Sequence, residues 1–146
     1  MVSTLVDTNV LLRQFEPAHA QYRAAVDGTL RLIENGEPTF VAAQNVTEFW
    51  AVATRQRQAN GLGLDAVTAE AAIETIERTF ALLPDDPAIH RHWKRLVAQH
   101  RVIGRRVFDI RIVAVMLVYG VERILTFNAD DFAGYGVEVI DPTAVA

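Results

Sequence analysis

The stretch STLVDTN at residues 3–9 decides how the rest of this sequence is interpreted. Val2 to Val6 is a short run of apolar and β-branched residues typical of a strand, and the apolar residues from Val10 to Phe15 suit the first turns of a helix. Asp7 therefore stands where a strand ends and a helix begins. Ligands collect at that point in an open α/β sheet, because the carboxyl ends of parallel strands and the amino ends of the following helices face one crevice.

Asp7 has two interpretations at this position. It can cap the helix, since Asp, Thr and Asn are all favoured immediately before one. It can also bind a hard cation through its carboxylate oxygens. These seven residues alone favour the cap, so the decision depends on polar residues farther along the chain.

The composition predicts a single domain over residues 1–146. Hydrophobic residues make up 51% of the chain and charged residues 22%, which argues against disorder. The absence of cysteine excludes disulfides, thiolate metal sites and thiol chemistry. The amino end lacks a signal-like segment, and the run from Asp109 to Tyr119 is too short to span a bilayer, so we expect a soluble cytoplasmic protein that makes no contact with membranes.

The net charge of -4 argues against a general polyanion binder, because broad nucleic-acid affinity comes from many phosphate contacts by cations. Lys94 is the one lysine among 14 basic residues, and arginine is the better bidentate partner for phosphate. A cluster of acids around a metal, in a protein with a mildly acidic surface, would give this net charge.

Strands and helices alternate along the chain. Apolar periodicity and turn residues predict strands at Val2–Val6, Thr39–Ala42, Leu82–Leu83, Val121–Phe127 and Val137–Ile140, with helices between them, among them Ala18–Glu34, the segment around Phe49, the segment opened by Asp65, the one opened by Asp86-Pro87 and the one from Asp109 to Val118. This α/β pattern calls for a central, mainly parallel sheet covered on both faces.

Two more acids lie at the heads or faces of these helices. Glu48 shares the polar side of its helix with Gln44 and Asn45, where it is either solvated or faces a cleft. Asp109 stands above an otherwise apolar helix face, which is expensive for a charge unless it is paired or bound to a metal. The alternative for Asp109 is a favourable interaction with the helix dipole.

These acids are expected to meet at one edge of the sheet. Parallel strands bring Asp7 together with the segment from Asn128 to Asp131, and Glu48 can face them from the helix after the second strand. Carboxylates that close cannot all ionise cheaply without a counter-charge. Mg²⁺ or Mn²⁺ would supply it, activate a water and neutralise charge on a phosphate, so the implied reaction is phosphodiester hydrolysis.

The ordered set of motifs resembles the PIN-domain family and, within it, the VapC-type toxins of bacterial toxin–antitoxin pairs. The matching features are Val6-Asp7-Thr8-Asn9, Glu48 within Val46–Trp50, Asp109 before an apolar helix, and Leu125–Phe132 near the end. They cover almost the whole chain. The resemblance implies a three-layer α/β/α sandwich with a central parallel sheet and a Mg²⁺-dependent endoribonuclease.

The resemblance also assigns roles to residues. It implies that Asp7 and Asp109 hold the metal with Glu48 nearby, and that Thr8 and Asn9 support the first acid, with Thr126 as a further supporting residue. Aligning on Thr126 puts the amide Asn128 at the fourth acidic, catalytic position, while Asp130 and Asp131 follow too late unless the loop rearranges, so that Asp131 is given a supporting place only. A neutral amide would hold a second ion weakly, which favours a one-metal site.

The resemblance implies three partners: an RNA substrate, a cognate antitoxin whose tail blocks the site, and a second copy of the chain in a homodimer. Arg105, Arg106 and Arg111 surround Asp109 in sequence and are candidates for contacts to RNA phosphates. For Arg111 the alternative is that it neutralises a local acid.

Two other functions remain open at this point. A phosphatase that uses a strand-end Asp as nucleophile would want a second Asp two residues on, where this chain has Asn9. A PIN-like fold kept as a binding or dimerisation module is favoured by the missing fourth acid and disfavoured by the intact Asp7, Glu48 and Asp109.

Overall fold

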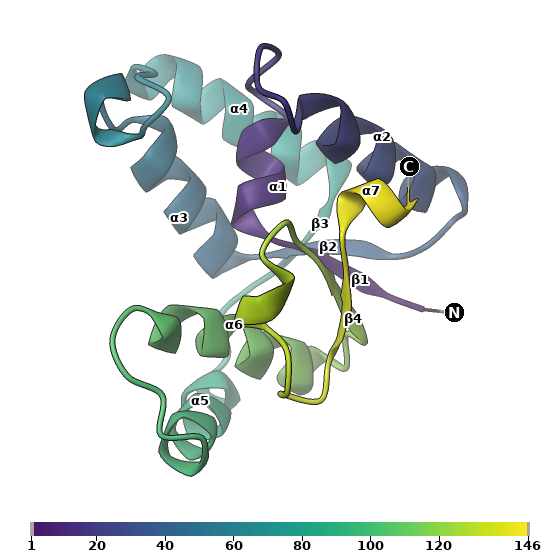
Figure 1. Ribbon diagram of the computed structural model, residues 1–146, viewed down its shortest axis with the longest axis vertical. Coiled ribbons are helices and arrows are strands. Elements are labelled where there is room, and N and C mark those ends of the chain that lie inside the picture. The colour runs from purple at the N-terminus through teal and green to yellow at the C-terminus, as the bar shows by residue number, and fades with distance from the viewer. Residues whose placement is uncertain (1, 146) are drawn as a thin grey trace.

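Five short strands form one parallel sheet in the computed structural model, which describes residues 2–145 (Figure 1). The order across the sheet is β3-β2-β1-β4-β5. The strands are β1 (Thr4–Val6), β2 (Thr39–Ala42), β3 (Ala81–Leu83), β4 (Arg123–Leu125) and β5 (Glu138–Ile140). In the register of the central strand β1, Leu5 lies opposite Phe40 of β2 and Ile124 of β4.

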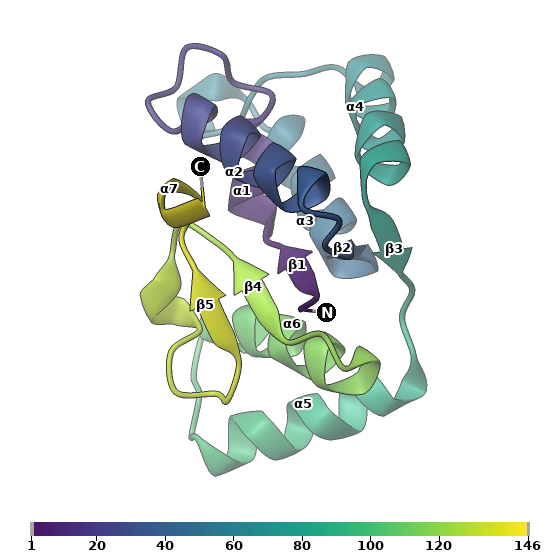
Figure 2. The same cartoon turned by 90° about the vertical axis from the view of Figure 1, so that its right-hand side faces the viewer.

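Helices cover both faces of the sheet, which confirms the predicted three-layer α/β/α arrangement (Figure 2). Helices α5 and α6 pack on one face, and α1 to α4 with α7 pack on the other. Their bounds are α1 (Thr8–Arg13), α2 (Tyr22–Glu34), α3 (Ala43–Ala53), α4 (Ala66–Thr79), α5 (Pro87–Gln99), α6 (Arg106–Tyr119) and α7 (Pro142–Val145). Within residues 2–145, no helix has both the length and the apolar content needed to cross a bilayer.

The alternation of side chains along each strand feeds two separate cores. Leu5 and Ile124 point into the core with α5 and α6, whereas Val6 and Leu125, one residue later on the same strands, point into the other core. Helix α6 is apolar on most sides and is buried from Ile112 to Met116, as its composition predicted. Apolar side chains therefore cover both faces of the central strands, and the polar groups of the site lie where the strands end.

The strand order reverses between β1 and β4, because the chain runs outward from β1 to β3 and then returns to β4 on the other side of β1. This is the topological switch point, where open α/β sheets bind their ligands beyond the carboxyl ends of the strands. Asp7 follows β1 and Thr126 follows β4, and the backbone N–H of Asp7 donates to the carbonyl of Leu125 at 3.0 Å.

Several predicted elements are shorter than expected, and two of the differences bear on the site or its surroundings. The helix predicted over Ala18–Glu34 begins at Tyr22, since the residues after Pro17 form turns in which the ring of His19 accepts a hydrogen bond from the N–H of Gln21. The strand predicted over Val121–Phe127 is reduced to Arg123–Leu125. After Leu125 the backbone turns toward the site, where the N–H of Phe127 donates to the side chain of Asn9 at 3.1 Å.

Candidate active site

Asp7 lies at the switch point and is held by three donors. Its Oδ1 accepts from the N–H of Thr8 at 2.8 Å, and its Oδ2 accepts from the Thr126 hydroxyl at 2.8 Å and from the Asn9 amide at 3.2 Å. Asp7 also precedes α1 and takes the capping position, so the two interpretations of this residue are compatible. Its side chain is buried, and that burial raises the pKa of Asp7 from 3.8 to about 6, with a further contribution from the charge of Asp131.

Asn9 and Thr126 tie the two sides of the switch point together. The amide of Asn9 donates to the Thr126 hydroxyl at 3.0 Å, and the same hydroxyl accepts from the N–H of Asn128 at 3.0 Å. The structure thus places both residues directly against Asp7, where the sequence analysis expected supporting groups. The orientation of the Asp7 carboxylate is fixed by residues that follow β1 and β4.

Glu48 approaches the same place from α3. Its Oε1 accepts from the hydroxyl of Thr8 at 3.3 Å, so the residue that follows Asp7 also orients Glu48. Burial raises the pKa of Glu48 to about 7, and the negative charges of Asp7 and Asp109 add to the increase. Glu48 is therefore a cleft residue and not a fully solvated one.

Asn45 is a functional residue that the sequence analysis missed, because it was grouped with the polar face of its helix. It is fully buried: its amide donates to the Thr8 hydroxyl at 3.1 Å, and its Oδ1 accepts from the N–H of Ala42 at 2.9 Å. A side chain three residues into a helix that reaches back to the N-cap N–H is half of a capping box. The position of Asn45 after the strand Thr39–Ala42 was the available signal.

Asp109 stands in the first turn of α6 and lines, together with Glu48, a cleft of about 340 Å³. Burial raises the pKa of Asp109 to about 6, and the charges of Asp131 and Asp7 raise it further. Arg106 and Arg105 act in the opposite direction. The cleft is lined by Glu48, Arg105, Arg106, Phe108, Asp109 and Asp131.

The structure brings Asp131, and not Asn128, to the cleft that Glu48 and Asp109 line. Residues Ala129–Asp131 form a 3₁₀ turn that folds the chain back, and Asp131 lines the cleft with Asp109. The side chain of Asn128 is exposed and lines a shallow hollow outside this cleft. The backbone carbonyl of Asp131 accepts from Arg106 at 3.1 Å, which ties the turn to α6.

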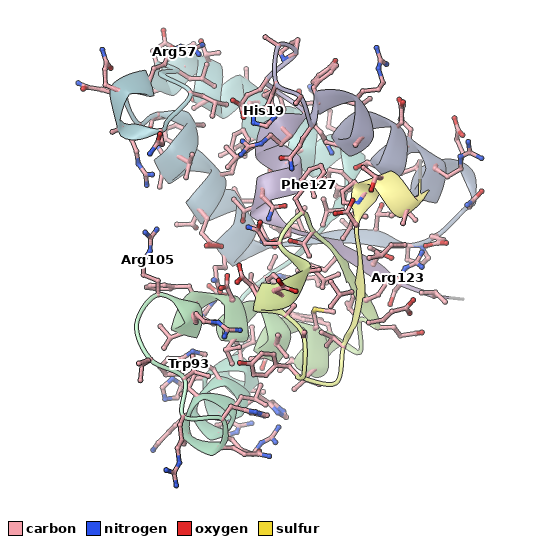
Figure 3. The ribbon with its side chains drawn as sticks, viewed as in Figure 1. His19, Arg57, Trp93, Arg105, Arg123 and Phe127 are labelled. Atoms are coloured by element: carbon pink, nitrogen blue, oxygen red, sulfur yellow. The ribbon has the colours of Figure 1, made fainter. Side chains whose placement is uncertain are left out.

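The three arginines divide into two groups. Arg111 donates to the Gln44 side chain at 2.9 Å and forms an ion pair with Asp85 at 3.2 Å, which favours the interpretation that it neutralises a local acid. Arg105 and Arg106 are exposed, and neither forms an ion pair in the described part of the chain. Figure 3 shows Arg105 extending outward from the start of α6.

The donor set fits a hard divalent cation. Asp7, Glu48, Asp109 and Asp131 offer only oxygen, and among the residues that the structure describes none of the four is paired with a basic side chain. Over residues 2–145, no three or more His, Asp and Glu side chains are arranged so that they could hold an ion together. Mg²⁺ takes one or two carboxylates and keeps several waters, so two of these acids would be enough to hold it.

The sequence model of the PIN domain matches residues 4–137, a span that includes all four carboxylates, and the chain belongs to the PIN-domain family. No curated protein matches the chain at a significant level of sequence similarity.

Solved structures with the same fold include three from toxin–antitoxin systems. DNA-bound VapBC from Salmonella typhimurium is 17% identical with a TM-score of 0.70, covering 97% of this chain and 99% of that one. A toxin–antitoxin complex from Klebsiella pneumoniae is 22% identical with a TM-score of 0.64, covering 96% and 98%. A VapC toxin from Mycobacterium tuberculosis that cleaves the sarcin-ricin loop is 19% identical with a TM-score of 0.64, covering 90% and 94%.

Proposed function

We propose that this protein is the toxin of a VapBC pair, a Mg²⁺-dependent endoribonuclease that hydrolyses RNA phosphodiesters. The observation that carries the proposal is the convergence of Asp7, Glu48 and Asp109, from three distant segments, at the switch point of the sheet. Burial raises the pKa of all three above the ordinary carboxyl range. None of them forms an ion pair with a basic side chain within the described residues, and Arg105 and Arg106 offset only part of the increase at Asp109. Such a group of acids is stable in its charged form when a divalent cation supplies the counter-charge.

Each acid has a distinct part in this proposal. Asp7, held by three donors, and Asp109, which lines the cleft, would hold Mg²⁺ with Asp131 nearby. The bound ion supplies an activated water and neutralises charge on the phosphate, and Mn²⁺ is the natural substitute. A carboxyl whose pKa is about 7 can accept and return a proton near neutral pH, so Glu48 is the residue to take the proton of the attacking water at its Oε atoms.

The partners are proposed on the similar structures and on the family resemblance. Several of the solved relatives are toxin–antitoxin complexes, and one is a toxin that cleaves the sarcin-ricin loop. We expect this chain likewise to have an RNA substrate, a cognate VapB-like antitoxin that covers the cleft, and a second copy of itself as a partner.

The alternative of a non-enzymatic binding module is weakened, because the carboxylate of Asp131 lines the cleft even though residue 128 is an amide. The phosphatase alternative is also disfavoured. The side chain of Asn9 is hydrogen-bonded to Asp7, to Thr126 and to the N–H of Phe127, so it holds these groups in place and is not available as an acid or base.

RNA cleavage by purified protein tests the proposal. Wild-type protein should cleave RNA in Mg²⁺ and not in excess chelator. Asp7→Asn and Asp109→Asn should each lose activity by about 100-fold or more, because changing residues that only support metal ligands already costs up to about 100-fold. Asp130→Asn is the matched control, since Asp130 is an exposed acid in the same turn as Asp131. Full activity of both site variants, or activity in chelator, would contradict the proposal.

A further inference from the structure

Phe108 is the one aromatic ring that lines the cleft with the acids, and it is 58% exposed. Leaving a phenylalanine side chain in water forgoes about 2 kcal/mol relative to burying it. Phe108 lies one residue before Asp109, in the first turn of α6, so its ring is at the rim of the acidic site. An exposed ring beside a reaction centre is a surface on which a ligand can pack.

The backbone that carries this ring is held from two sides. The amide of Gln44, on α3, donates to the carbonyl of Phe108 at 2.9 Å, and Gln44 is itself fixed by Arg111 at 2.9 Å. The indole N–H of Trp93, on α5, donates to the carbonyl of Val107 at 2.8 Å. The backbone that carries the Phe108 side chain is thus preorganised, which reduces the entropy lost when a ligand binds to the ring.

The charges around Phe108 select the kind of ligand. Arg105 and Arg106 line the same cleft and are free of ion pairs within residues 2–145, so they can accept an anion. Flat π-faces alternate with phosphates along a polynucleotide, and proteins that bind single strands combine aromatic rings with cationic side chains in this way. An acidic peptide would offer anions but no planar group that matches the exposed ring.

We propose that the ring of Phe108 is a stacking subsite for an RNA base next to the cleaved phosphodiester, with Arg105 and Arg106 on the neighbouring phosphates. The proposal builds on the ribonuclease function above. A base inside a duplex is stacked on both faces and cannot also stack on a protein side chain, so the nucleotide at this subsite must be unpaired. Phe108 would therefore determine which positions of an RNA are cut.

Binding of defined strands to variants of Phe108 tests this, with every variant made in the Asp7→Asn background so that the strand is not cleaved. Loss of the stacking interaction with one base raises the dissociation constant roughly 5- to 150-fold. Phe108→Leu should lose this factor for a labelled oligoadenylate, whereas Phe108→Trp should bind at least as well as the parent. The matched control is Leu117→Ala, a partly exposed position on the same helix that does not line the cleft.

A strand of ribose phosphates without bases makes the test specific to stacking. On this probe Phe108→Leu and its parent should bind equally, because no base is present to stack. Equal binding of the oligoadenylate by both proteins, or an equal loss on the baseless strand, would overturn the inference. Weakened binding of the antitoxin without any effect on RNA would overturn it too, since Phe108 would then be a protein contact.

The result can be separated from a failure of the ribonuclease function. If the wild-type protein cleaves RNA in Mg²⁺ but Phe108→Leu cleaves single-stranded and duplex RNA at wild-type rates, the subsite is wrong and the function stands. If the wild-type protein cleaves no RNA, the function is wrong, and the binding series then decides whether Phe108 contacts a base at all. Thermal unfolding of each variant should change little, because the ring is largely exposed.

Discussion

Asp131 and Asn128 belong to the same short turn, but only Asp131 lines the cleft with Glu48 and Asp109. We predict that Asp131→Asn raises the Mg²⁺ concentration needed for half-maximal RNA cleavage by about tenfold or more, as loss of a group beside a metal site does. Asn128→Asp should leave that concentration nearly unchanged. The reverse pattern, with a gain from Asn128→Asp and no loss from Asp131→Asn, would place Asn128 at the site.

Asp7 links the charge of the site to protein stability. Burial raises its pKa from 3.8 to about 6, so the folded protein binds a proton at Asp7 more tightly than the unfolded chain does. Folding stability from this group is therefore highest below about pH 4 and is lost as the pH rises through about 6. This difference in pKa between the unfolded and the folded protein corresponds to about 3 kcal/mol of folding stability when no metal is bound.

We therefore predict a pH-dependent difference in stability between Asp7→Asn and wild type, measured in chelator. The free energy of unfolding of Asp7→Asn minus that of wild type should increase by up to about 3 kcal/mol when the pH is raised from about 4 to about 7. Urea denaturation at both pH values measures it, and Mg²⁺ should narrow the gap by stabilising the charged wild-type site. Asp65→Asn is a control without this trend, because hydrogen bonds from Thr68 lower the pKa of Asp65, so its contribution to stability changes below about pH 4 and not between pH 4 and 7. A difference between wild type and Asp7→Asn that does not change with pH would contradict the prediction.

At the scale of elements, α7 depends on a glycine in α2. A Cβ placed on Gly28 would lie 2.9 Å from the carbonyl oxygen of Pro142, so the two helices can pack this closely only without that side chain. Helix propensity alone predicts that Gly28→Ala stabilises the protein by about 1 kcal/mol. We predict instead a loss of about 1 to 3 kcal/mol, because backbone of α7 must move.

Urea denaturation of Gly28→Ala gives the sign directly. Ala24→Gly, four residues earlier in the same helix, calibrates the propensity effect and should lose about 1 kcal/mol. A more stable Gly28→Ala protein would mean that α7 is not packed against α2 as the structure has it.

Elements with a long periodic pattern could be predicted from the sequence, and short irregular ones could not. The starts of α4 at Asp65 and α5 at Asp86 follow from capping residues, and both caps accept the expected backbone hydrogen bonds. The 3₁₀ turn at Ala129–Asp131 has too few residues to show a period, so its return toward the site was not predictable. Asn45 was missed because a polar residue type says nothing about whether its hydrogen bonds are made inside the protein.

At the scale of the whole molecule, the sheet topology accounts for the meeting of the acids. Alternating strands and helices require parallel strands, and parallel strands place the residues that follow them on one edge. That much was accessible from the sequence, including the convergence of Asp7 with the segment after β4. The pairing of Arg111 with Asp85 and the exposure of Phe108 depend on how α3 and α6 pack, which no local pattern encodes.

The central claim is that Asp7 and Asp109, far apart in the sequence, hold one divalent cation. Calorimetric titration of Mn²⁺ into the purified protein at about pH 8 tests it most directly, since the acids of the site are then charged. We predict saturable binding of one ion per chain in the wild-type protein, and loss of that binding in both Asp7→Asn and Asp109→Asn. Absence of binding to the wild-type protein, or undiminished binding in both variants, would contradict the account.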